Sequence, residues 1–153
     1  MKNQIRYVHT NIIAENWKSL AQFYIDVFEC EPVLPERDLS GEWIDKLTML
    51  QGARLKGIHL KLPGYKDGPT LEIFEYNEIS GNPSSPLINN KGLAHIAFHV
   101  SDVDIALDNL IANGGQRYGE IVEKKYDGIG TVRAVYAKDP EGNIIELQNW
   151  CKE

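Results

Sequence analysis

The sequence predicts an α+β protein in which a module of strand, helix and three further strands occurs twice. Two segments have the spacing of an amphipathic helix, and a short β-like run precedes each of them. Three more β-like runs follow each helical segment. A repeated order of elements indicates a duplicated structural unit. We expect the first module over residues 5–76 and the second over residues 92–150.

The first helix is expected in the segment NWKSLAQFYIDVF, where apolar residues recur at helical offsets and Asn16 can serve as the N-cap. The run IRYVHTNII, beginning at Ile5, predicts the strand before it. The strands after it are expected near residues 31–35 and in KGIHLKL and TLEIFEY. The intervening stretch RDLSGEWIDKLTMLQG is expected to form a short helix or a lid over a site.

The second helix is expected in SDVDIALDNLIANGG, where Ser101 and Asp104 have the spacing of a capping box and Gly114 can end the helix. The run GLAHIAFHV predicts the strand before it, and YGEIVEKKY, GTVRAVYAK and NIIELQNW predict the strands after it. The segment DPEGN, residues 139–143, has the Pro and Gly chemistry of a turn between the last two strands.

The stretch between the two modules, residues 77–91, is rich in Asn, Ser, Pro and Gly and is expected to be a linker. A chain of 153 residues has the length of one ordinary domain. We therefore expect residues 1–153 to form one domain made of two modules and a linker.

Composition excludes several classes of protein. The formal charge is −6 and Lys and Arg are not clustered, which argues against a nucleic-acid partner. The N-terminus has no apolar segment typical of a secretory signal, and no apolar run is long enough to span a membrane. Cys30 and Cys151 are too few for a disulfide framework and are expected as free thiols. These features predict a cytoplasmic protein without a membrane partner.

Four residues on the first and last strands of the two modules form the candidate site. Successive side chains of a strand point to opposite faces, and in each of these strands the His or Glu lies opposite the apolar residues suited to helix packing. A curved sheet with its helices on the convex side would gather these residues in its concave cup. They are His9, Glu72, His95 and Glu146.

Two imidazoles and two carboxylates suit one divalent first-row ion, and Ni²⁺, Zn²⁺, Co²⁺, Mn²⁺ or Fe²⁺ would each be accepted. A six-coordinate ion with four protein ligands keeps two positions for water or substrate, as a Lewis-acid catalyst requires. Each residue alone would be an ordinary strand residue. Their occurrence at matching strand positions of both modules is what favours a metal site.

Other polar residues are candidates for contact with a substrate. Asn11, His99, Gln148 and Trp150 share the face of the ligands on their strands, and His59 alternates away from its apolar neighbours. Arg133 could pair with a substrate carboxylate, although solvent exposure would also explain it. For His59 and His99 the simpler alternative is a histidine whose hydrogen bonds are satisfied within the sheet.

Five segments give the chain a resemblance to a known family. They are YVHTNI, FYIDVFECEPV, TLEIFEY, GLAHIAFHVSDVD and KDPEGNIIELQNW. With them the chain resembles the glyoxalase/bleomycin-resistance/extradiol-dioxygenase superfamily, whose fold is the vicinal oxygen chelate fold. The resemblance implies two paired βαβββ modules that form a curved mixed-sheet cup with helices outside, and a homodimer, as in many members. It also implies the ligand set His9, Glu72, His95 and Glu146.

The order His, Glu, His, Glu is most similar to that of lactoylglutathione lyase. This resemblance implies proton transfer through a metal-stabilised enediolate on a small carbonyl or thiohemiacetal substrate. Glu146 is the expected base, and Glu72 is the other candidate acid or base. Three alternatives stay open: an acyl-CoA epimerase, although those tend to carry Gln at the position of Glu72; an extradiol-type dioxygenase, which uses three iron ligands; and a non-catalytic resistance-type protein that sequesters a small molecule.

Overall fold

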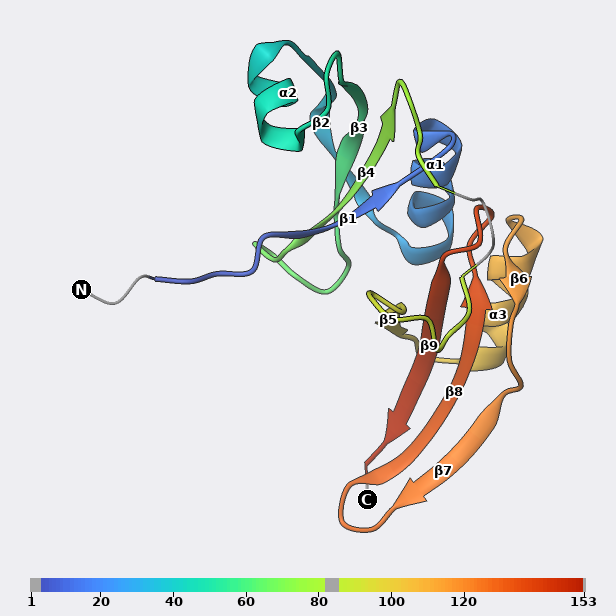
Figure 1. The fold of residues 1–153 in the computed structure, drawn as a ribbon. Helices are drawn as coiled ribbons and strands as arrows, with labels where there is room; N and C mark the ends of the chain where they lie inside the picture. The colour runs from blue at the N-terminus through green and yellow to red at the C-terminus, as the bar shows by residue number, and fades with distance from the viewer. Residues whose placement is uncertain (1–3, 82–85, 153) are drawn as a thin grey trace. The chain divides into compact units, whose positions relative to one another are not determined.

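The computed structural model describes residues 4–81 and 86–152. The chain divides into two compact units, Met1–Asn82 and Pro83–Glu153. The described residues of the first unit form a mixed sheet and two helices, and those of the second form a mixed sheet and one helix. The α+β character predicted from the sequence is confirmed in both (Figure 1). The division falls within the stretch 77–91 expected as a linker, of which residues 82–85 lie outside the described part. The interpretation of 1–153 as one domain stays a prediction.

The first unit is a four-stranded sheet with two helices. Its strand order is β1-β4-β3-β2, with β1 parallel to β4 and the other pairs antiparallel. Helix α1 packs against β3 and β4 (Figure 1). The elements in chain order are β1 (His9–Ile13), α1 (Trp17–Phe28), β2 (Glu31–Ser40), α2 (Glu42–Thr48), β3 (Arg54–Lys61) and β4 (Thr70–Tyr76).

Local chemistry explains the helices of this unit. The side chain of Asn16 accepts a hydrogen bond from the backbone N–H of Ser19 and caps α1, as predicted. The stripe of α1 that includes Leu20 and Tyr24 is buried against the sheet. The short helix predicted after β2 is confirmed as α2, whose Ile44 packs in a small cluster with Ala53, Leu55 and Phe74.

Two strand boundaries in this unit differ from the prediction. β1 begins at His9 instead of Ile5, and Ile5, which is 94% exposed, has no core to join. β2 continues to Ser40, well beyond residue 35, because it keeps its pairing with β3 across a register shift between Val33 and Arg37. The predicted short helix therefore begins only at Glu42.

The second unit repeats the arrangement. Its main strand order is β5-β9-β8-β6, β7 also pairs with β8, and β5 is parallel to β9. Helix α3 contacts β6, β8 and β9. In Figure 1, β7, β8 and β9 curve along their length. The elements are β5 (Ile96–His99), α3 (Val103–Ala112), β6 (Gln116–Arg117), β7 (Val122–Tyr126), β8 (Gly130–Lys138) and β9 (Ile144–Cys151).

Two local features complete the second unit. The N-cap of α3 is Asp102, whose carboxylate accepts from the N–H of Ile105, so the expected cap at Ser101 is wrong by one residue. The predicted turn at 139–143 joins β8 to β9, and the carboxylate of Asp139, 1% exposed, accepts from the N–H groups of Glu141 and Asn143. This turn sets the register of β9 against β8.

Two further expectations are addressed by the described residues. Cys30 is buried and Cys151 is exposed, and both are free thiols. No helix among residues 4–81 and 86–152 is both long and apolar enough to cross a bilayer. The cytoplasmic location stays a prediction.

Candidate metal site

In the first unit, the carboxylate of Glu72 is at the centre of a polar cluster. Its Oε2 atom lies 3.2 Å from His9 Nε2 and accepts a hydrogen bond of 3.0 Å from Asn11 Nδ2. Its Oε1 atom lies 3.0 Å from His59 Nε2. The strand register explains this convergence, because both Asn11 on β1 and His59 on β3 are paired with Glu72 on β4. Residues directly opposite one another share a face of the sheet.

The ring of His59 is fixed on both sides. Its Nδ1 atom lies 3.0 Å from Thr70 Oγ1, and the edge-on contact with Phe74 has a centroid distance of 6.0 Å. The rings of His9 and His59 meet edge to face at 5.5 Å. Burial lowers the pKa of His59, and the negative charge of Glu72 opposes that shift. Burial therefore favours a neutral imidazole, the form that binds metal ions.

The second unit carries the equivalent pair in less polar surroundings. His95 Nε2 lies 3.0 Å from Glu146 Oε2, and the His95 ring contacts the ring of Tyr136 at 5.1 Å. Tyr136 on β8 and Ala97 on β5 are paired with Glu146 on β9. Within the described part of the chain, His95 Nδ1 is a buried polar atom without a hydrogen-bond partner.

An unpaired buried polar group costs about 1–3 kcal/mol, so Nδ1 of His95 lowers the stability of the fold unless a partner reaches it. Of the four predicted ligands, His9 contacts Glu72 in the first unit and His95 contacts Glu146 in the second. That both pairs serve one ion stays a prediction.

The residues in the first unit fit a divalent ion. The ligand atoms of His9, His59 and Glu72 lie within 4.8 Å of one another, and each residue offers one. Imidazole and carboxylate together suit first-row divalent ions. This cluster contains two of the four ligands expected from the sequence, His9 and Glu72, together with His59, which was expected only as a substrate contact.

The remaining substrate-contact candidates have the following places. Asn11 is engaged with Glu72, and His99 is an exposed residue at the end of β5. The guanidinium of Arg133 is held by Asp104 at 2.7 Å and by Glu123 at 3.0 Å. Gln148 Oε1 accepts from Trp150 Nε1 at 2.7 Å. Contact of any of them with a substrate stays a prediction.

Sequence reasoning missed two neighbours of the site, Thr70 and Tyr136. Thr70 begins β4 two residues before Glu72, and Tyr136 lies on β8 opposite Glu146. The signal for both was present, because strand alternation places Thr70 on the face of Glu72 and the turn at 139–143 pairs 136 with 146.

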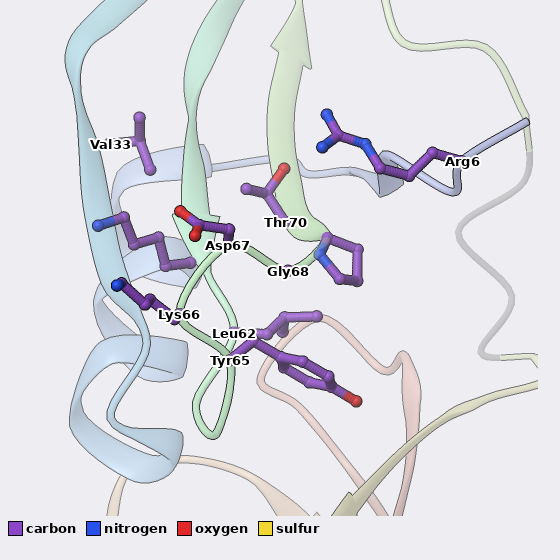
Figure 2. A pocket seen from close by; sticks show the side chains of 10 residues that line it. Arg6, Val33, Leu62, Tyr65, Lys66, Asp67, Gly68 and Thr70 are labelled. Carbon is purple, nitrogen blue, oxygen red and sulfur yellow. The ribbon is translucent and has the colours of Figure 1, made fainter. Parts of the chain in front are cut away.

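A pocket of about 360 Å³ lies next to this cluster and is entirely within the first unit. His59, Thr70, Arg6 and Arg37 are among its lining residues. A smaller neighbouring pocket, of about 320 Å³, shares Arg6, Asp67 and Thr70 with it, and Figure 2 shows these side chains around its rim. A small molecule in the larger pocket would therefore touch His59, the residue that contacts Glu72.

Comparison with known proteins agrees with the fold. A sequence model of the Glyoxalase/Bleomycin resistance protein/Dioxygenase superfamily matches residues 6–147. A 2-epi-5-epi-valiolone epimerase from an Actinomyces species is 35% identical over 117 residues, which is 74% of this chain and 61% of the relative. The chain thus spans less than two thirds of that relative's length.

Two solved structures share the architecture. A glyoxalase family protein from Bacillus cereus has a TM-score of 0.83 at 19% identity, over 97% of this chain and 96% of that one. A genomically encoded fosfomycin resistance protein from Listeria monocytogenes has a TM-score of 0.54 at 16% identity, over 99% and 96% of the two chains. At these identities the similarity concerns the fold alone.

Proposed function

Because this chain belongs to the Glyoxalase/Bleomycin resistance protein/Dioxygenase superfamily, we propose that it is a divalent-metal-dependent isomerase that moves a proton on a carbon next to a carbonyl group. The proposed ion ligands are His9, Glu72, His95 and Glu146. The observation that carries this proposal is the His–Glu contact formed in both units, 3.2 Å in the first and 3.0 Å in the second. Each histidine lies two residues before the residue that is paired with the glutamate, His9 at the start of β1 and His95 one residue before β5.

A bound divalent ion supplies Lewis acidity, which lowers the cost of removing a proton from the carbon beside a carbonyl. The protein must then provide a carboxylate that takes up this proton and can return it. A carboxylate that is free to move between the ion and the substrate suits that role better than one held at both oxygens.

The surroundings of the two glutamates support a division of roles. Glu72 is engaged at Oε1 by His59 and at Oε2 by Asn11 and His9, so its orientation is set. Among the residues that the structure describes, Glu146 has a polar contact with His95 through Oε2, beside the aliphatic Ala97. We therefore assign Glu146 as the base and Glu72 as the ligand with the fixed orientation.

Two substrate classes are proposed. The identity of 35% to a 2-epi-5-epi-valiolone epimerase favours an epimerase reaction on a related compound. The order of the four ligands favours the lactoylglutathione-lyase type. Both reactions remove and return a proton next to a carbonyl, so the proposed residues and their roles are the same in either case.

The test is proton exchange in deuterated water, followed by NMR spectroscopy. The purified chain, loaded with Co²⁺ or Ni²⁺, is incubated either with 2-epi-5-epi-valiolone or with the methylglyoxal–glutathione adduct. We expect deuterium uptake that requires the ion and is lost in Glu146→Gln, while Glu141→Gln, a change in the nearby turn, leaves the rate unchanged.

Other outcomes would favour the alternatives. Full exchange by Glu146→Gln would show that Glu146 is not the base. Oxygen uptake with catechols and Fe²⁺ would indicate a dioxygenase, and ligand binding unaffected by a chelator would indicate a sequestering protein. We also propose a homodimer, which light scattering of the purified protein checks.

A further inference from the structure

We infer that the first unit binds a divalent ion by itself, through His9, His59 and Glu72, with His59 as a ligand beyond the four proposed above. This inference rests on the proposed metal dependence and changes which residues hold the ion. Its consequence is that the ion stays bound when the ligands of the second unit are removed.

The distances between the three residues agree with a shared ion. Two ligand atoms that each lie about 2.1 Å from an ion are about 3 Å apart when they occupy adjacent octahedral corners. His9 Nε2 and His59 Nε2 lie 3.2 Å and 3.0 Å from separate oxygens of Glu72. Small shifts of the side chains would therefore let one ligand atom of each residue bind the same ion.

The orientation of His59 gives a second, independent argument. A histidine bound to a metal normally has its other ring nitrogen hydrogen-bonded to a fixed partner, which sets the tautomer and the ring orientation. Thr70 Oγ1 lies 3.0 Å from Nδ1 of His59, so the threonine hydroxyl can be the hydrogen-bond partner of that second ring nitrogen. When the hydroxyl accepts from Nδ1–H, the Nε2 lone pair points to the side of the Glu72 carboxylate, the orientation in which both can bind one cation. In the other tautomer Nε2–H donates to Glu72, and titration with Co²⁺ distinguishes the two.

The second unit lacks these features. Tyr136 lies opposite Glu146, where the first unit has His59 opposite Glu72. Two residues before Glu146 is Ile144, where the first unit has Thr70, and the buried Ile144 side chain cannot accept a hydrogen bond. Only two of the candidate ligands, His95 and Glu146, lie in that unit. Ion retention is therefore expected to depend mainly on the first unit.

The experiment is titration of the full-length apoprotein with Co²⁺, followed by calorimetry and by the visible absorption of the bound ion. In His59→Ala the affinity should fall by more than about 100-fold, beyond the 10–100-fold typical of losing an outer partner, and the absorption band should shift. In Thr70→Val the affinity should fall about 10–100-fold with little change in the band. The control Asp127→Ala, at an exposed turn residue, should titrate like the wild type.

The double variant His95→Ala/Glu146→Gln tests the independence of the first unit. It should still bind one Co²⁺ per chain, whereas His9→Ala should not. Circular dichroism of each variant checks folding, and His59→Gln replaces His59→Ala if the latter is unfolded.

Wild-type affinity and absorption in both His59 variants would overturn the inference, leaving His59 as an ordinary hydrogen-bonding residue. Loss of the ion in the double variant, as complete as in His9→Ala, would overturn the independence of the first unit. Either result leaves the proposed function in place. Failure of the wild-type protein itself to bind any divalent ion would instead remove the proposed function.

Discussion

Tyr136 lies opposite Glu146 in the β8–β9 pair, at the position where His59 lies opposite Glu72 in the β3–β4 pair. The two sheets thus present their carboxylates at the same register but surround them differently. Asn11 in the first unit corresponds to Ala97 in the second, since each is paired with the glutamate of its own sheet. The carboxylate of Glu72 contacts His9, Asn11 and His59. The carboxylate of Glu146 contacts His95, and Glu146 is paired with Tyr136 and Ala97.

The ring of Tyr136 is expected to hold His95 in place for ion binding. Tyr136→Ala removes the contact at 5.1 Å and should weaken Co²⁺ binding about tenfold, as is typical when a group supporting a ligand is lost. Tyr136→Phe keeps the ring and should bind within about twofold of the wild type by the same comparison. Calorimetric titration of both variants distinguishes these cases. Equal binding by Tyr136→Ala would show that His95 needs no such support.

The Asp139 carboxylate is expected to stabilise the turn that precedes the β9 strand. It is buried and accepts hydrogen bonds of 2.9 Å from the Glu141 N–H and of 3.0 Å and 2.8 Å from the backbone and side chain of Asn143. Asp139→Ala leaves these donors unpaired and should lower the free energy of unfolding by about 2–4 kcal/mol. Urea unfolding measures this. Asp127→Ala, in an exposed turn, is the matched control, and an equal effect of both variants would contradict the assignment.

Gly57 is expected to be essential for the close pairing of β3 with β4. A Cβ atom at this position would lie 2.0 Å from the carbonyl oxygen of Ile73 and 2.1 Å from the ring of Phe74. Gly57→Ala should therefore lower the free energy of unfolding by about 1–3 kcal/mol, the usual cost of overpacking, or more because backbone must move. Gly119→Ala, where a Cβ meets nothing closer than 3.9 Å, is the control.

Because Gly57 lies two residues before His59, its substitution should also weaken ion binding in the same titration. A Gly57→Ala variant with wild-type stability and affinity would show that the two strands adjust without cost.

The two cysteines should differ sharply in reactivity. Burial raises the pKa of the Cys30 thiol from 9.0 to about 12, whereas Cys151 is exposed. A thiol reagent at neutral pH should therefore label one cysteine rapidly and the second only after denaturant is added. Mass spectrometry of the labelled peptides identifies them. Rapid labelling of Cys30 in the folded protein would contradict its burial.

The same pKa shift predicts lower stability in alkali. Above about pH 9 the unfolded chain releases the Cys30 proton while the folded chain keeps it, so the free energy of unfolding falls as pH rises. Cys30→Ala should lose this part of the pH dependence, although it also leaves a small cavity. Unfolding midpoints at pH 8 and pH 10, compared between the two proteins, provide the check.

The sequence predicted which helices and strands form better than it predicted the residues at which they begin and end. Helical spacing identified α1 and α3, and strand alternation placed Glu72 opposite the buried Leu71 and Ile73, and Glu146 opposite the buried Ile145 and Leu147. The start of β1 was predicted too early because Ile5 and Val8 have the composition of a strand but lack a neighbouring strand or core. The start of β1 depends on its pairing with β4, which lies far away in the sequence and cannot be read from local composition.

The candidate site was predicted as one group of four residues around one ion, and within it the structure forms a His–Glu contact in each unit. The grouping of all four around one ion stays a prediction. His9 with Glu72 and His95 with Glu146 follow from the repeat, since equivalent positions of a duplicated module lie in equivalent places. The contact of His59 with Glu72 depends instead on the register between β3 and β4, which are joined by a loop of eight residues, 62–69, without a defined hairpin turn. By contrast, the five-residue turn at 139–143 fixed the register of Tyr136 with Glu146.

The shared register of the two sheets also offers a route for protein engineering. Ala97→Asn, Tyr136→His and Ile144→Thr would transfer the polar surroundings of Glu72 to Glu146 without altering the strand pairing. Each half of the duplicated chain can thus be redesigned separately, with the other half as an internal reference. From the proposed first-unit site we expect a protein built in this way to bind two Co²⁺ ions per chain. Comparison of its affinity with that of the natural chain would measure how the residues at 97, 136 and 144 affect ion binding.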